Sequence, residues 1–157
     1  MRIGVISDTH GYLDPRAVVA LQGVARILHA GDIGNPAIIN ALEVIAPVDA
    51  VHGNVDAGTP LARRFPASRQ ILIEDVLIHM THYGGQPAAL ARGLPQPKPD
   101  VYVFGHSHVA LLETLNGVLF LNPGAAGRPR FGGGLSVAIL DVEAARAEAR
   151  IVPLSDL

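Results

Sequence analysis

Five strand-like apolar runs in this chain are each followed, within a few positions, by side chains that can bind a metal ion. In open α/β sheets, ligands bind outside the carboxyl ends of the strands. Polar side chains at those ends should therefore converge on one crevice, although they lie far apart in the sequence. The side chains in question are Asp8, His10, Asp32, Asn54, His82, His106 and His108.

The first third of the sequence predicts an alternation of strands and helices. Strands are expected at Arg2–Ser7, Arg26–Ala30 and Val48–His52, because these runs are short, apolar and rich in β-branched residues. Asp14-Pro15 and Asn35-Pro36 each place a capping residue before a proline, which is typical of the start of a helix. This β-α-β-α-β order predicts parallel strands with helices on the faces of the sheet.

The remaining sequence predicts further strands, some of them joined as hairpins. Asn116-Gly117 is a strong hairpin signal. Glu143–Ala149 is rich in helix-forming residues, but a hairpin of Ser136–Val142 with Ala147–Leu154 would complete the sheet and is preferred. The other expected elements are strands at Arg69–Glu74, Val76–Thr81, Asp100–Phe104, Val109–Leu115 and Val118–Leu121 and a helix at Gln86–Arg92. We therefore expect one α/β domain over residues 1–157, with mixed strands in two packed sheets.

Composition excludes several classes of function. The formal net charge is −2 with no block of like charges, so an extended nucleic-acid surface is not expected. There is no cysteine, which excludes disulfides and thiolate zinc sites. No apolar run approaches the length of a membrane span, and the sequence MRIGVISDTHG does not have the features of a signal peptide. A soluble, cytoplasmic protein is the resulting expectation.

Each polar position has an ordinary explanation when it is taken singly. Asp8 could cap a helix, and Gly31-Asp32 and Gly53-Asn54 could be plain turns. Their recurrence at the same end of successive strands is what chance explains poorly. Histidines combined with aspartates and one amide suit Zn²⁺, Mn²⁺ or Fe²⁺ better than Ca²⁺ or Mg²⁺. Seven ligands suit two ions that share a carboxylate, roughly 3.5–4 Å apart.

The order D-x-H, G-D, G-N, H, G-H-x-H resembles that of the calcineurin-like metallophosphoesterases, in particular their small single-domain bacterial and archaeal phosphodiesterases. The resemblance implies two mixed β-sheets packed as a sandwich and flanked by helices, a four-layer fold. It implies that one ion is held by Asp8, His10 and His108, and that Asp32 bridges both ions. The second ion would be held by Asn54, His82 and His106.

The same resemblance implies hydrolysis of a small phosphoester by a hydroxide that bridges two divalent metals. Mn, Fe, Zn or Ni would serve, with Mn favoured for activity. Asp32 and Asn54 would be catalytic, with Asn54 positioning the phosphoryl oxygen. A protein-sorting subunit of eukaryotes shares this fold as a binding scaffold, so a weakly catalytic or non-catalytic scaffold is the alternative. A homodimer is expected only as the commonest oligomeric state.

The sequence departs from the family pattern in several places. The histidine that follows Gly-Asn in larger members is absent, so either Asp56 or His52 substitutes as the acid or the leaving group needs no acid from the protein. His52 is expected to contact substrate. Tyr83 follows His82, where small members have glycine, and His79 is an alternative ligand to His82. Arg128 and Arg130 either reach a phosphate or lie on a solvated loop.

Overall fold

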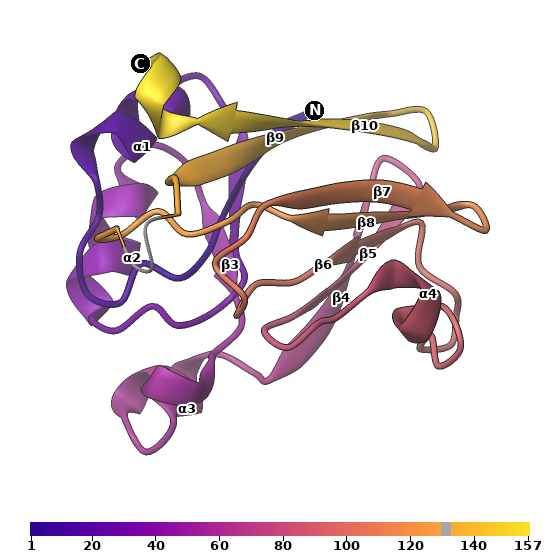
Figure 1. Ribbon diagram of the computed structural model, residues 1–157, viewed down its shortest axis with the longest axis horizontal. Helices are drawn as coiled ribbons and strands as arrows, with labels where there is room; N and C mark the ends of the chain where they lie inside the picture. Colours follow the sequence, from indigo (N-terminus) through magenta and orange to yellow (C-terminus); the bar gives the residue numbers. More distant parts are fainter. Residues whose placement is uncertain (130–132) are drawn as a thin grey trace.

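The computed structural model describes residues 1–129 and 133–157, which form two five-stranded mixed sheets (Figure 1). The strand order is β10-β9-β1-β2-β3 in the first sheet and β4-β5-β6-β8-β7 in the second. Helices cover the outer faces, so the predicted α/β sandwich of two mixed sheets is confirmed.

The first sheet combines the parallel strands near the amino terminus with a carboxyl-terminal hairpin. Its parallel strands are β1 (Arg2–Ile6), β2 (Arg26–His29) and β3 (Val48–Ala50). The hairpin strands β9 (Ser136–Glu143) and β10 (Arg146–Pro153) pair with each other over eight positions, and β9 also pairs with β1. The preference for a hairpin over a helix was therefore correct, because sheet pairing outweighs the propensity of a few residues.

The second sheet has three parallel strands between two antiparallel edges. β5, β6 and β8 run parallel, and β4 and β7 pair antiparallel with β5 and β8. The predicted hairpin turn at Asn116-Gly117 joins β7 to β8, and both of its residues have positive φ. The bounds are β4 (Ser68–Ile73), β5 (Val76–Thr81), β6 (Val101–Val103), β7 (Leu111–Leu115) and β8 (Val118–Asn122).

The α-helices are short, and each begins with a proline. The Asp14 side chain accepts from Arg16 N at 2.8 Å and the Asn35 side chain accepts from Ala37 N at 2.9 Å, so both predicted caps are confirmed. The helices are α1 (Pro15–Ala20), α2 (Pro36–Glu43), α3 (Pro60–Arg64) and α4 (Pro87–Leu90), with 3₁₀ turns at Asn54–Asp56 and Leu154–Asp156. The sequence did not predict α3 or the 3₁₀ turns. None of the helices within the described ranges combines the length and apolar character needed to cross a membrane.

Three apolar layers hold the elements together. Ile39 and Leu42 of α2 pack with Ile27 and Ile6 against the outer face of the first sheet. A second layer, which includes Val5 and Met80, fills the space between the sheets. On the far face of the second sheet, a third layer contains Tyr102, Phe104, Val118 and Phe120, with Leu90, Ala91, Leu94, Leu111 and Leu115 packed against it. The strand ends are thereby fixed by burial on both sides.

Candidate metal centre

All seven residues predicted from the strand ends come together at one rim, although they belong to both sheets. Asp8 and His10 follow β1, Asp32 follows β2 and Asn54 follows β3, all in the first sheet. In the second sheet, His82 follows β5, and His106 and His108 follow β6. Two groups of side chains at this rim each bring three donor atoms within 4.8 Å of one another: Asp8, His10 and His108 in one, and Asp32, His82 and His106 in the other.

The first group directs an unsatisfied carboxylate oxygen at two imidazoles. Asp8 Oδ1 is buried and makes no hydrogen bond to any described residue, yet it lies 3.4 Å from His108 Nε2 and 3.7 Å from His10 Nε2. The other oxygen, Oδ2, accepts from Ser7 Oγ at 2.8 Å and from His106 N at 3.0 Å. A buried carboxylate oxygen left without a donor is costly, and a bound cation would remove that cost. The group therefore fits a metal ion.

The second group presents a histidine in the state that binds a metal. His82 Nδ1 lies 2.8 Å from the carbonyl oxygen of Ala30 and donates to it. In the neutral ring Nε2 then carries the lone pair, and it lies 3.3 Å from Asp32 Oδ2 and 3.1 Å from the side-chain amide of Asn54. A hydrogen bond from the far ring nitrogen to a carbonyl is the usual support of a metal-binding histidine.

Asp32 lies between the two groups. Its Oδ2 is 3.4 Å from His10 Nε2 and 3.3 Å from His82 Nε2, so one carboxylate oxygen contacts a histidine from each group. Its Oδ1 accepts from Val55 N at 2.9 Å, which fixes the orientation of the carboxylate. This is the arrangement that a bridging ligand requires.

The backbone at the rim adopts a conformation that L-residues rarely tolerate. Five of the seven residues have positive φ: Asp8 (54°), His10 (49°), Asp32 (56°), His106 (74°) and His108 (63°). Each such residue carries a conformational cost, and a cluster of them is typical of functional sites. Backbone hydrogen bonds across the rim, Asp8 N to Gly31 O at 3.0 Å and His10 N to Asp32 O at 2.9 Å, hold two of these residues in place.

The glycine before each of three of these strand-end residues allows close approach. A Cβ at Gly31 would lie 2.7 Å from His82 Nδ1, and one at Gly53 would collide with the Asp32 carboxylate. A Cβ at Gly105 would collide with Ser7 Oγ. The glycines are therefore required for packing of the two groups and not only for turning the chain.

Charge within the second group shifts both of its titratable partners. Burial alone would lower the pKa of His82, but the Asp32 carboxylate and the Ala30 carbonyl outweigh it, and the net pKa is raised. Burial alone would raise the pKa of Asp32, but its hydrogen bonds to His82 and Val55 leave the net pKa lowered. Both shifts favour proton binding at His82 beside the Asp32 carboxylate, so protons and cations compete for this position.

A buried histidine beneath the rim supports it from below. His29 Nδ1 accepts from Gly31 N at 3.1 Å, and His29 Nε2 lies 3.0 Å from Thr9 Oγ1. Thr9 Oγ1 in turn donates to Ile33 O at 3.0 Å. Burial lowers the pKa of His29 to about 4, so the ring is neutral and donates through Nε2. This chain of bonds fixes the residues next to Asp8 and Asp32, and its partners could not be predicted from the sequence.

The structure does not support two alternatives that the sequence left open, Asp56 as the acid and His79 as a metal ligand. Asp56 is fully buried and accepts from the backbone nitrogens of Ile33, Gly34 and Gly53 at 2.9–3.1 Å, so its carboxylate organises loops and is not placed to act as an acid. His79 lies with its ring 5.0 Å from the Tyr102 ring, outside both donor groups, because alternate residues of β5 face opposite sides of the sheet.

His52 remains beside the centre. Its Nδ1 lies 2.8 Å from Phe65 O, and the residue lines a hollow of about 160 Å³ with Asn54, His82 and Tyr83. Arg128 stacks its guanidinium 4.2 Å above the ring of Tyr12. Arg130 lies outside the described residues.

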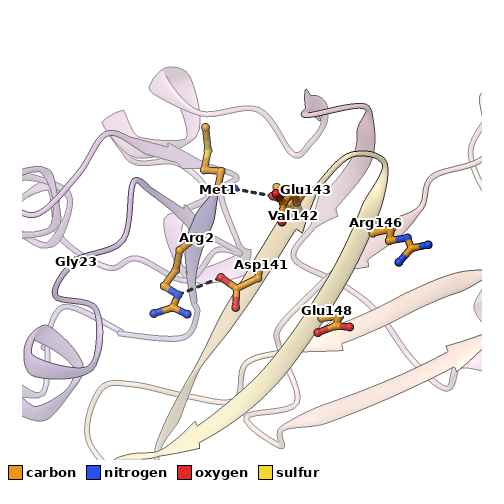
Figure 2. Close-up of a pocket in the computed structure, with 8 residues that line it drawn as sticks. All are labelled: Met1, Arg2, Gly23, Asp141, Val142, Glu143, Arg146 and Glu148. Atoms are coloured by element: carbon orange, nitrogen blue, oxygen red, sulfur yellow. Dashed lines mark hydrogen bonds and ion pairs between the residues drawn. The ribbon is translucent and has the colours of Figure 1, made fainter.

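Another hollow lies at the opposite end of the first sheet (Figure 2). Its volume is about 580 Å³, and it lies at the amino end of β1, whereas the donor groups lie beyond the carboxyl end. The Met1 amino group donates to Val142 O at 2.6 Å, and Arg2 Nε donates to Asp141 at 3.0 Å. Arg2 and Asp141 are about half exposed, so the pair is well solvated and marks no chemical site.

Comparisons with known proteins agree with this geometry. A family model for the calcineurin-like phosphoesterase superfamily domain matches residues 1–145. A protein of Methanothermobacter thermautotrophicus named a probable metallophosphoesterase is 35% identical over 161 residues, which cover 97% of this chain and 92% of the relative.

Solved structures show the same fold. An archaeal phosphodiesterase superposes with a TM-score of 0.77 at 25% identity, over 97% of this chain and 100% of that one. Vps29 of Entamoeba histolytica complexed with Zn²⁺ superposes with a TM-score of 0.78 at 21% identity, over 98% and 99% of the two chains. At 21% identity the likeness to Vps29 shows the fold alone.

Proposed function

This chain belongs to the calcineurin-like phosphoesterase superfamily, and we propose that it is a phosphodiesterase that hydrolyses a small phosphoester with two divalent metal ions. One observation carries the two-ion proposal. Asp32 Oδ2 lies within 3.4 Å of a histidine nitrogen from each of the two donor groups. A carboxylate shared in this way suits two ions at the separation found in dinuclear hydrolases, roughly 3.5–4 Å.

The proposed ligands follow from the two groups. Asp8, His10 and His108 hold one ion, His82, His106 and Asn54 hold the other, and Asp32 bridges them. Imidazole nitrogens mixed with carboxylates suit Mn, Fe, Zn or Ni, whereas Ca²⁺ and Mg²⁺ prefer oxygen ligands. We favour Mn for activity.

The chemistry that the ions supply when bound is activation of water near neutral pH and neutralisation of the charge that develops on the phosphoryl group. The chain's own residues position the reactants. Asn54 lies beside His82 and orients a phosphoryl oxygen, and Asp32, held by Val55 N, keeps the two halves of the centre in register. To His52, which lines the same hollow as Asn54, we assign transfer of a proton to the departing oxygen; because Nδ1 donates to Phe65 O, the proton would come from Nε2 of the protonated ring. No serine or cysteine nucleophile is required.

Cleavage of bis-(p-nitrophenyl) phosphate by the purified protein tests the proposal. We expect turnover that depends on added Mn²⁺ and stops when a chelator removes it. The alternative hypothesis is that the protein is a scaffold of the same fold with little hydrolytic activity. It would be favoured if release of p-nitrophenol stays at the uncatalysed rate with Mn²⁺, Zn²⁺, Fe²⁺ and Ni²⁺ at measured full occupancy.

A further inference from the structure

A hollow of about 370 Å³ opens beside His106. The loop after β5 supplies one wall through Gly84, and β6 and the loop after it supply Phe104, His106 and Val109. Leu111 also lines the hollow. This volume lies within the range of small-ligand pockets, about 300–1,000 Å³. Because His106 belongs both to the hollow and to the second donor group, the hollow lies next to the proposed centre.

Apart from Gln86 and His106, the polar side chains of this hollow are bonded to one another or to the backbone. Asn122 is fully buried, and its amide nitrogen donates to Gly105 O at 3.1 Å and to Ser107 Oγ at 3.0 Å. Its amide oxygen accepts from Gly124 N at 2.9 Å. Ser107 Oγ also accepts from Val109 N at 3.2 Å. These groups therefore have little hydrogen-bonding capacity left for a ligand.

The described residues that line this hollow include no Asp, Glu, Lys or Arg. Among these described residues, His106 is the one titratable side chain. A second phosphate group would meet no cationic side chain in this lining, and an ammonium group would meet no carboxylate. An uncharged ligand group fits this environment, because burying an unpaired charge is costly.

The glycine wall is what keeps the hollow open. A Cβ at Gly84 would collide with the ring of Phe104, so only glycine lets the loop cross this ring closely. Tyr83, just before it, lines the smaller hollow with His52, and its ring lies 4.8 Å from the His106 ring. Tyr83 therefore lies between the hollow beside Asn54 and the hollow beside His106.

We infer that the hollow beside His106 binds an uncharged apolar ester group of the phosphodiester substrate, of which a phenyl group is the simplest example. The inference rests on the proposed phosphodiesterase function, because the phosphoryl group must lie on the metal centre for its ester group to reach the hollow. The hollow would therefore favour diesters that carry an apolar group over diesters that carry a second charged group.

Binding of two phosphonates tests this inference without turnover. Phenylphosphonate and methylphosphonate carry the same anionic group, so the ratio of their dissociation constants on the manganese-loaded protein isolates the effect of the phenyl group. We expect calorimetry to show phenylphosphonate binding at least tenfold more tightly. Val109→Asp places a charge at the rim of the hollow, where the residue is 67% exposed and its replacement does not disturb the core. This variant should reduce the ratio severalfold.

Val44→Asp is the matched control, since Val44 is 87% exposed on the far helical layer. It should leave the ratio as in the unaltered protein. A ratio near one in the unaltered protein, an unchanged ratio in Val109→Asp, or no binding of either phosphonate would overturn the inference. Turnover of bis-(p-nitrophenyl) phosphate is measured in parallel. Turnover without phenyl selectivity would refute only the pocket, whereas phenyl selectivity without turnover would refute only the proposed hydrolytic function.

Discussion

His10 Nε2 and His108 Nε2 lie 3.2 Å apart, although 98 residues separate them in the chain. His10 follows a strand of the first sheet and His108 follows a strand of the second, so this contact joins the rims of the two sheets. Two imidazole nitrogens that face each other can share one proton or one cation. A bound ion would therefore link the two halves of the fold.

We expect added Mn²⁺ to raise the thermal unfolding midpoint. A ligand that binds only the folded state stabilises it by about 2.7 kcal/mol at a hundredfold excess over its dissociation constant. For a chain of this length that corresponds to about 5–10 °C. Calorimetric scans with Mn²⁺ and with a chelator measure the difference. Coincident scans would mean that no ion binds preferentially to the folded protein.

Asp32→Asn should reduce turnover by at least about a thousandfold while the fold persists. Asparagine can still accept from Val55 N, but it carries no charge to share between two cations. Initial rates with bis-(p-nitrophenyl) phosphate measure the loss, and circular dichroism checks the fold. Asp141→Asn, in the distant hollow of Figure 2, is the matched control and should keep full activity. Near-normal turnover in Asp32→Asn would refute the bridging role.

Metal stoichiometry tests the division into two groups. His108→Ala and His82→Ala each remove a ligand from one group only, so each should bind one Mn²⁺ per chain tightly where the unaltered protein binds two. Titration calorimetry and metal analysis after desalting give the counts. His79→Ala is the control, because His79 belongs to neither donor group. Loss of both ions in either ligand variant would show that the two positions do not bind independently.

The strand ends could be located from the sequence because two signals coincide there. An apolar β-branched run predicts a buried strand, and a glycine followed by a polar residue, as in Gly31-Asp32, predicts where it stops. Parallel topology then places such ends at one rim. The convergence of the seven side chains could therefore be predicted from these local patterns together with the expected topology, whereas their division between two ions was implied by the family resemblance.

The residues that support the rim could not be located in this way. Asp56 bonds to the backbone of Ile33 and Gly34, and His29 bonds to Thr9, so the roles of both depend on loops that meet only after folding. A sequence pattern carries no information on such partners. The same holds for α3, a single short helix whose proline and threonine cap are common in turns.

His29 should make the protein less stable in acid. Its folded pKa is about 4, below the ordinary value of 6.5, so the unfolded chain binds the proton first as the pH falls. Its contribution is fully present above pH 6.5 and is lost toward pH 4, by about 3 kcal/mol in total. Urea unfolding of the chelator-treated protein at pH 7 and pH 4.5 measures the loss. His29→Asn, although less stable at pH 7, should show a smaller difference between the two pH values, and an equal difference would assign the acid sensitivity to other groups.

His52 should matter most when the leaving group is poor. If it protonates the departing oxygen, its removal affects phenol release strongly and p-nitrophenol release weakly, because p-nitrophenolate leaves without help. We expect His52→Gln to slow hydrolysis of diphenyl phosphate by about a hundredfold and that of phenyl p-nitrophenyl phosphate by much less. Both esters keep a phenyl group, so substrate binding is matched on that side. An equal loss for the two esters would instead indicate that His52 positions Asn54 or the Phe65 loop, to which its Nδ1 is bonded.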